Sequence, residues 1–105
     1  MATSINQTSV NTQLRDLIDY SKPGVSRQIL VNSGSDRFSV VCLTARTALP
    51  EHTTRRNVSI IVLEGRGILT LEGREIALEP GVFVYLPANA PHALQATENL
   101  AFLHT

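Results

Sequence analysis

The feature that most constrains the fold is a series of short apolar stretches that runs from Val25 to the end of the chain. Val, Ile, Leu and Thr dominate these stretches, and Gly, Pro or Asn separates them, which is typical of β-strands joined by tight turns. No helical crossover pattern interrupts the series. We therefore predict an all-β domain, an antiparallel sandwich or barrel of about eight strands. The candidate strands are residues 25–32, 37–45, 57–65, 67–73, 74–81, 82–88, 92–97 and 100–105.

The beginning of the chain has a different character. Residues 1–12 are polar and rich in Ser, Thr, Asn and Gln, which predicts a flexible N-terminal arm. Within residues 13–20, apolar side chains at helical spacing predict at most one short helical turn. A chain of 105 residues can bury one core but not two, so we expect residues 13–105 to form a single barrel domain.

The composition excludes several classes of partner. Nine basic and nine acidic residues give a formal net charge of zero, which argues against general nucleic-acid binding. No apolar run approaches the roughly 20 residues of a membrane span, and the first residues do not have the pattern of a signal peptide. The only cysteine, Cys42, cannot form an intrachain disulfide, so a reducing compartment fits better. We expect a cytoplasmic protein without a nucleic-acid or membrane partner.

Two groups of residues fall at intervals that are found together in one family. His52 and Gly65 fit the first histidine and the last glycine of a motif with Gly, His, His, Glu and Gly at fixed spacing. Gly81, Pro87 and His92 fit a second motif, with Gly, Pro, Gly, His and Asn. From about residue 25 onward the chain resembles a small single-domain cupin of the RmlC-like, cupin type-2 class. The resemblance implies a double-stranded β-helix, or jelly-roll barrel.

The chain departs from both motifs at positions that matter for chemistry. Thr54 stands in place of the second histidine and Val58 in place of the glutamate, so two of the four usual metal ligands are missing. Arg46 and Asn89 replace glycines, and Ala96 replaces the final asparagine. The resemblance therefore supports the fold more strongly than it supports the usual metal site.

The candidate site rests on the two histidines that remain. The resemblance implies that His52 and His92 converge inside the barrel, where two imidazoles would bind a divalent transition metal (Zn, Ni, Mn, Fe or Cu) weakly. His104 is a third candidate ligand, although both faces of its strand are apolar and the pattern does not show which one points inward. Alternation of side chains along the strands then gives the predicted pocket lining. These residues are Thr54, Val58, Ile60, Val62, Leu94 and Phe102.

Two classes of function remain open at this level. One is a metal-dependent protein with an incomplete site, which the retention of His52 and His92 favours. The other is a metal-free barrel that binds a small molecule as a sensor or accessory protein, which Val58 at the glutamate position favours. Arg55 and Arg56 follow the histidine stretch and could attract an anionic substrate, although exposed arginines in a turn are more often simply solvated. The sequence does not distinguish an enzyme from a binding protein.

The sequence also suggests self-association. The zero net charge gives little electrostatic protection against contact between copies. The predicted strand at residues 25–32 has apolar side chains and could add to the sheet of a second copy, which would cover its exposed edge. We therefore expect a homodimer.

Overall fold

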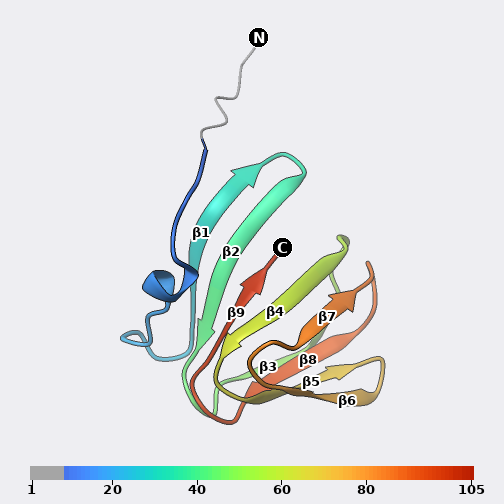
Figure 1. Cartoon of the computed structure of the whole chain (residues 1–105). Helices are drawn as coiled ribbons and strands as arrows, with labels where there is room; N and C mark the ends of the chain where they lie inside the picture. Colours follow the sequence, from blue (N-terminus) through green and yellow to red (C-terminus); the bar gives the residue numbers. More distant parts are fainter. Residues whose placement is uncertain (1–8) are drawn as a thin grey trace.

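The computed structural model describes residues 9–105, which form two antiparallel sheets (Figure 1). One sheet has the strand order β1-β2-β9-β4-β7 and the other β3-β8-β5-β6. The predicted all-β jelly roll is thereby confirmed. The elements are a 3-10 turn η1 (Leu14–Leu17), β1 (Val25–Ser33), β2 (Asp36–Leu43), β3 (Ala48–His52), β4 (Val58–Glu64), β5 (Gly67–Leu71), β6 (Arg74–Leu78), β7 (Phe83–Leu86), β8 (His92–Ala96) and β9 (Leu100–His104).

Strand β3 is the one strand of the described chain that the apolar pattern does not mark. It is short, largely exposed, and contains Pro50 and Glu51. It pairs only with β8, at the edge of the four-stranded sheet, and its register shifts between Leu49 and His52. Proline is tolerated in a sheet mainly at such edges, because it cannot donate a ladder hydrogen bond. Pairing with β8, rather than local propensity, makes this segment a strand.

The core lies between the two sheets and follows the alternation of side chains along the strands. In β2, Val41 and Leu43 point into this core, whereas Val40 and Cys42 point to the outer face. Leucines from several strands are almost fully buried, and burial of each contributes about 1.5–3 kcal/mol to folding. The apolar core therefore carries the stability of the barrel without help from the histidines. Its largest fully buried members are Leu43, Leu69, Leu78, Leu86, Leu100 and Val62.

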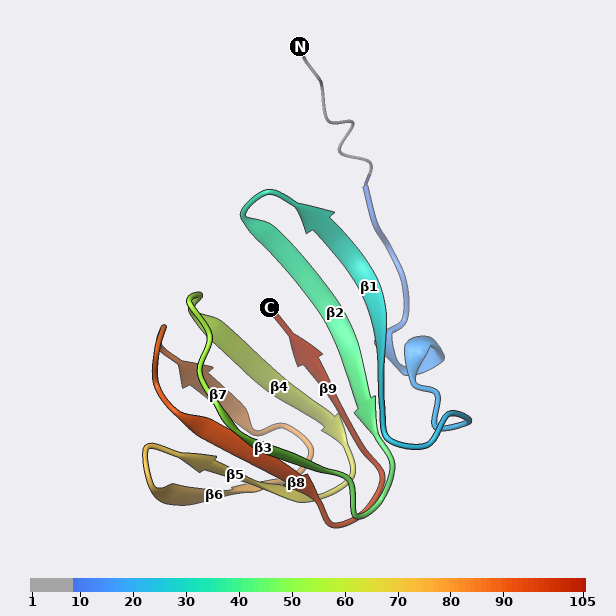
Figure 2. The same ribbon diagram turned by 180° about the vertical axis from the view of Figure 1, so that it is seen from behind.

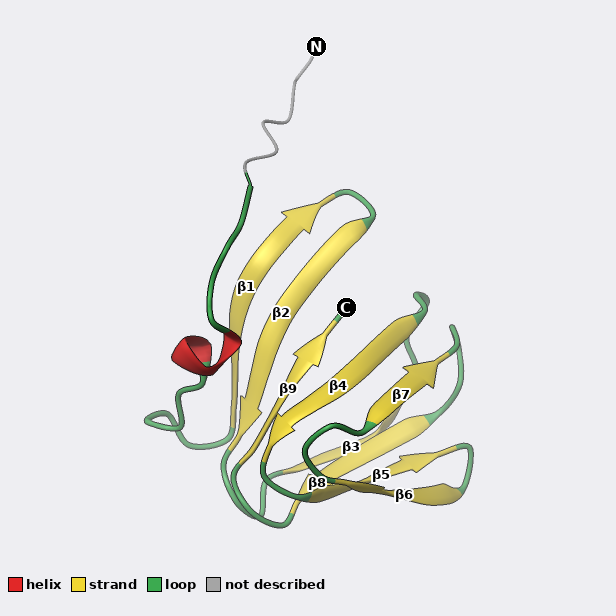
Figure 3. Ribbon diagram, viewed as in Figure 1, coloured by secondary structure: helices red, strands yellow, loops and turns green. Residues whose placement is uncertain are grey.

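The N-terminal segment covers part of the outer face of the five-stranded sheet. The helical turn predicted within residues 13–20 is the element η1, the only helix in the described chain (Figure 3). Side chains of this segment pack on Val40, Cys42 and Ala101, and the Tyr20 hydroxyl donates to Glu64 Oε2 at 2.8 Å. Burial, together with this hydrogen bond and the Glu64 charge, raises the pKa of Tyr20. Most of the predicted arm, residues 1–8, lies outside the described residues.

The β1–β2 hairpin extends beyond the rest of the molecule, as the two opposite views show (Figures 1 and 2). Strand β1 is the outer edge of its sheet and pairs only with β2. Its side chain Ile29 is 64% exposed, and Phe38 on β2 is 39% exposed. The hairpin thus holds apolar side chains away from the main core. Within the described chain, no helix has the length and apolar character to cross a membrane.

Candidate functional site

The fold brings His52 and His92 together. They lie on the neighbouring strands β3 and β8 and stand directly opposite each other in the antiparallel register. Their ring centroids are 4.3 Å apart, with an angle of 60° between the ring planes. His92 is buried, whereas His52 is exposed at the edge of the sheet. The two imidazoles thus form one pair at the mouth of the barrel, where the sequence expectation put them.

Hydrogen bonds to the main chain define the orientation of both rings. His52 Nδ1 lies 3.0 Å from the carbonyl oxygen of Pro50, and His92 Nδ1 lies 2.9 Å from that of Ala90. A carbonyl oxygen only accepts, so each Nδ1 must carry the hydrogen that is donated. In a neutral imidazole the other nitrogen, Nε2, then keeps its lone pair. Both rings therefore offer Nε2 as an acceptor or a ligand atom.

His104, near the end of β9, lines the same cavity as the pair. Burial lowers the pKa of His104 to about 4, and the charges of Arg27, Arg56 and His92 act in the same direction. Its ring is therefore neutral near pH 7. Among residues 9–105, however, no three His, Cys, Asp or Glu side chains are arranged to hold one ion. The donor set in this part of the chain thus fits two positions of a metal shell, those of His52 and His92.

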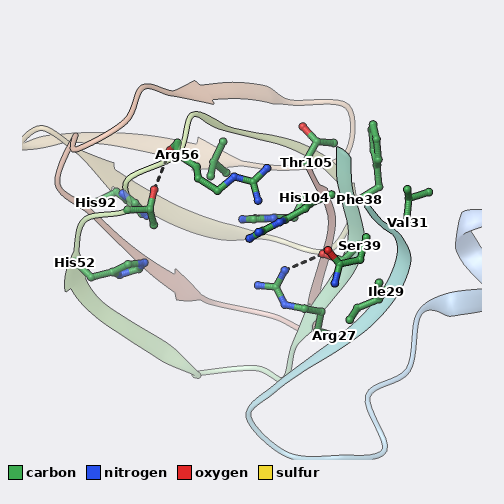
Figure 4. A pocket seen from close by; sticks show the side chains of 14 residues that line it. Arg27, Ile29, Val31, Phe38, Ser39, His52, Arg56, His92, His104 and Thr105 are labelled. Atoms are coloured by element: carbon green, nitrogen blue, oxygen red, sulfur yellow. Dashed lines mark hydrogen bonds between the residues drawn. The ribbon is translucent and has the colours of Figure 1, made fainter. Parts of the chain in front are cut away.

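The cavity has a volume of about 350 Å³ and lies between the histidines and the β1–β2 hairpin (Figure 4). Thr54 and Val58 line it, and Val58 also lines a smaller, deeper cavity of about 90 Å³. Of the other predicted pocket residues, Val62 is in the core and lines neither cavity, because it lies further along β4. The deeper cavity is lined by the three remaining ones, Ile60, Leu94 and Phe102.

The Arg, Lys, Asp and Glu side chains of the described chain that line the larger cavity are all arginines. Arg27, Arg37 and Arg56 line it, and no Asp or Glu side chain of the described chain does. Arg27 Nη1 donates to Ser39 Oγ at 2.8 Å. Arg55, the neighbour of Arg56, is exposed and does not line the cavity.

Sequence reasoning missed the arginine on β1. Arg27 shares one face of its strand with Ile29, and both line the cavity. This alternation was visible in the sequence. The sequence did not indicate that this face of β1 would turn toward the histidines.

A comparison with known protein families identifies the family of this chain. The model of the cupin domain matches residues 39–104, which span β9 and β3 to β8 and most of β2. The chain belongs to the cupin family. This cupin is 31% identical over 62 residues to an uncharacterized protein of Methanocaldococcus jannaschii, and the match covers 59% of the chain. It spans about half of that relative, 49% of its length.

Solved structures agree with this fold. A cupin superfamily protein of Desulfitobacterium hafniense superposes with a TM-score of 0.82 at 20% identity, over 98% of this cupin and 95% of that chain. The TT1209 protein of Thermus thermophilus gives a TM-score of 0.80 at 20% identity, over 91% and 94% of the two chains. Salicylate 1,2-dioxygenase of Pseudoaminobacter salicylatoxidans is 25% identical, with a TM-score of 0.71, over 80% of this cupin and 25% of that chain.

The two motif glycines that this cupin replaces have a conformational explanation. Arg46 has φ 72° and Asn89 has φ 70°, both in the left-handed region that glycine adopts without a steric penalty. The backbone of the motif is therefore preserved although the residues differ. Asparagine tolerates this region better than most residues, whereas arginine carries the full cost.

Proposed function

We propose that this cupin binds a small molecule in the cavity between the β1–β2 hairpin and the histidine pair, and that His52 and His92 hold a divalent transition metal there weakly. The observation that supports this most directly is the pair of Nδ1 hydrogen bonds to the carbonyls of Pro50 and Ala90. Partners of this kind fix the tautomer and the ring orientation of histidines that bind metals through the other nitrogen. The same bonds leave both Nε2 atoms free to bind a metal.

The number of donors sets the expected strength and pH dependence. Catalytic zinc sites normally have three protein ligands, so a site with two should bind more weakly. Protons compete for the same Nε2 lone pairs, so metal affinity should be lower at acid pH. A bound metal would supply Lewis-acid chemistry with open coordination positions. The contribution of the chain is to orient His52 and His92 beside a largely apolar cavity.

Calorimetric titration of untagged protein with Zn, Ni, Mn, Fe(II) and Cu(II) tests this proposal. We expect weak binding that His52→Ala and His92→Ala each abolish, while the circular dichroism melting curve remains close to that of the unmodified protein. Val58→Glu should tighten binding, because Val58 lines both cavities and a carboxylate there can complete the donor set. If neither the unmodified protein nor Val58→Glu binds metal at millimolar concentration, the metal part of the proposal is wrong.

A second candidate is a metal-free cupin that binds a small molecule without catalysis. The three arginines that line the cavity favour it, because they repel a divalent cation and no Asp or Glu side chain among residues 9–105 lines the cavity to offset them. In that case His52 and His92 act as hydrogen-bonding groups toward the ligand through Nε2. The titration above separates the two candidates, since only the first requires bound metal.

A further inference from the structure

We infer that the cavity recognises a small organic carboxylate, whose anionic group lies on Arg27 and Arg56 and whose apolar body lies against Ile29, Val31 and Phe38. This inference names the ligand class and rests on the proposed function, namely that the cavity receives a small molecule. It does not require the metal.

The two arginines come from distant parts of the sequence and meet at one place. Arg27 lies on β1, and Arg56 lies in the connection between β3 and β4. Both side chains extend toward His104 in the middle of the cavity (Figure 4). Two positive side chains that line one cavity attract an anion into it.

A hydrogen bond holds the guanidinium of Arg27 in position, whereas the bond at Arg56 fixes only its main chain. Arg27 Nη1 donates to Ser39 Oγ at 2.8 Å, and Ser39 is only 4% exposed, so the guanidinium is fixed on a buried group. Near the other arginine, Thr54 Oγ1 donates to the carbonyl oxygen of Arg56 at 3.0 Å. Fixed donors lose less conformational freedom when a ligand binds than mobile ones do. The cavity is therefore partly organised before a ligand arrives.

The chemistry of the lining favours a carboxylate. A guanidinium presents paired N–H donors that match the two oxygens of a carboxylate, and no Asp or Glu of the described chain lines the cavity to occupy them. A phosphate would also attract arginine. However, the lining contains no glycine, and phosphate sites commonly use backbone N–H groups of Gly-rich loops or helix N-termini.

The other wall of the cavity requires an apolar body on the same ligand. Ile29 is 64% exposed and Phe38 is 39% exposed, and both line the cavity together with Val31. Covering this surface removes apolar area from water, which favours binding. The volume of about 350 Å³ suits a small ligand. A hydrophilic anion such as acetate would leave this wall uncovered.

The strand that supplies Arg27, Ile29 and Val31 lies outside the region that the family model matches. That region begins at Ser39, after β1. The carboxylate site is thus assembled from the family barrel on one side and from the β1–β2 hairpin of this chain on the other. For this reason the inference concerns this cupin rather than cupins in general.

Binding of three probes in metal-free buffer, followed by calorimetry or by ligand-observed NMR, tests the inference. Benzoate carries the carboxylate on an apolar ring, benzamide has nearly the same shape without charge, and phenyl phosphate carries the alternative anion. We expect benzoate to bind about tenfold or more tightly than benzamide, as a charge-assisted hydrogen bond predicts, and more tightly than phenyl phosphate. Equal binding of benzoate and benzamide, or no binding of benzoate at millimolar concentration, would overturn the inference. Tighter binding of phenyl phosphate would overturn the assignment to carboxylates.

Substitution of the arginines identifies the residues. Arg27→Gln and Arg56→Gln should each weaken benzoate about tenfold and leave benzamide unchanged. Arg55→Gln is the matched control, because Arg55 is adjacent but does not line the cavity, and it should leave benzoate binding unchanged. An equal loss in all three variants would indicate only a long-range effect of net charge and would refute the site.

The outcome is separable from that of the proposed metal site. If the protein binds no metal but still binds benzoate more tightly than benzamide, this inference stands. If the protein binds metal but does not discriminate between benzoate and benzamide, this inference is refuted and the metal proposal is not. The melting curve of Arg56→Gln should match that of the unmodified protein, because its side chain lies outside the apolar core. That of Arg27→Gln should be somewhat lower, because the buried Ser39 hydroxyl loses its hydrogen-bond partner.

Discussion

Replacing Gly65 by Ala would push a methyl group into the backbone of the turn before β9. Gly65 has φ +90°, and a Cβ atom there would lie 1.8 Å from Asn99 O and 2.7 Å from Leu100 Cα. The left-handed conformation costs an alanine about 1–2 kcal/mol. Overpacking adds a further 1–3 kcal/mol, roughly, and here the obstructing atoms are backbone that cannot rotate away. We therefore expect a total loss of about 2–5 kcal/mol, which for a domain of this size lowers the melting temperature by roughly 10 °C or more.

Urea unfolding measured by circular dichroism checks this, with Gly81→Ala as the matched control. Gly81 has φ +93°, almost the same value, but an added Cβ there meets no atom within 4 Å. It should therefore show the conformational cost alone, about 1–2 kcal/mol. The difference between the two variants isolates the steric contribution at Gly65. If Gly65→Ala is no more destabilising than Gly81→Ala, the reasoning from the close approach of the two turns is wrong.

Three further expectations concern other parts of the molecule. In the folded protein, burial is the main cause that holds the pKa of His104 at about 4, and the neighbouring charges are a further cause. As the pH falls below 6.5, the unfolded chain therefore takes up a proton on this histidine before the folded protein does. The stability that depends on a neutral His104 is thus fully present above about pH 6.5 and is lost as the pH falls toward 4. His104→Gln should remove on the order of 2 kcal/mol of this pH dependence, measured by urea unfolding. An unchanged slope of the free energy of unfolding against pH would argue against it. Arg46→Gly should raise stability by up to about 1 kcal/mol in thermal melts, because φ 72° suits glycine; a lower melting temperature would contradict this. Light scattering should give the mass of a dimer through the free edge of β1, and a monomer mass at high micromolar concentration would speak against pairing there.

The strands could be predicted from the sequence because Val, Ile and Leu dominate them and Gly, Pro or Asn separates them, and in several of them every second side chain is buried. Strand β4 illustrates this, since Val58, Ile60 and Val62 are buried and the residues between them are not. Strand β3 could not be predicted, because Ala48–His52 has no such alternation and contains a proline. Its pairing with β8 depends on where the rest of the barrel holds it, and local propensity does not contain that information.

Some residues of the candidate site could likewise be predicted from the sequence, and others could not. The resemblance to cupins implied that His52 and His92 converge, and the register places them opposite each other. The apolar pattern could not show which face of β9 points inward, and the structure places His104 on the cavity side with Phe102. Arg27 could not be assigned to the site from the sequence at all. Its contribution depends on the curvature of a hairpin, which is a property of the packed molecule.

The overhanging β1–β2 hairpin divides the cavity into two parts with different constraints on their evolution. His92 lies on β8, where a change in backbone disturbs the neighbouring strands on both sides, β3 and β5. The wall with Arg27 and Ile29 belongs to a strand that is bonded along one edge only. Substitutions on that wall should therefore change the ligand preference of the cavity without loss of the barrel. Transplanting this hairpin onto a related barrel should therefore carry ligand preference with it.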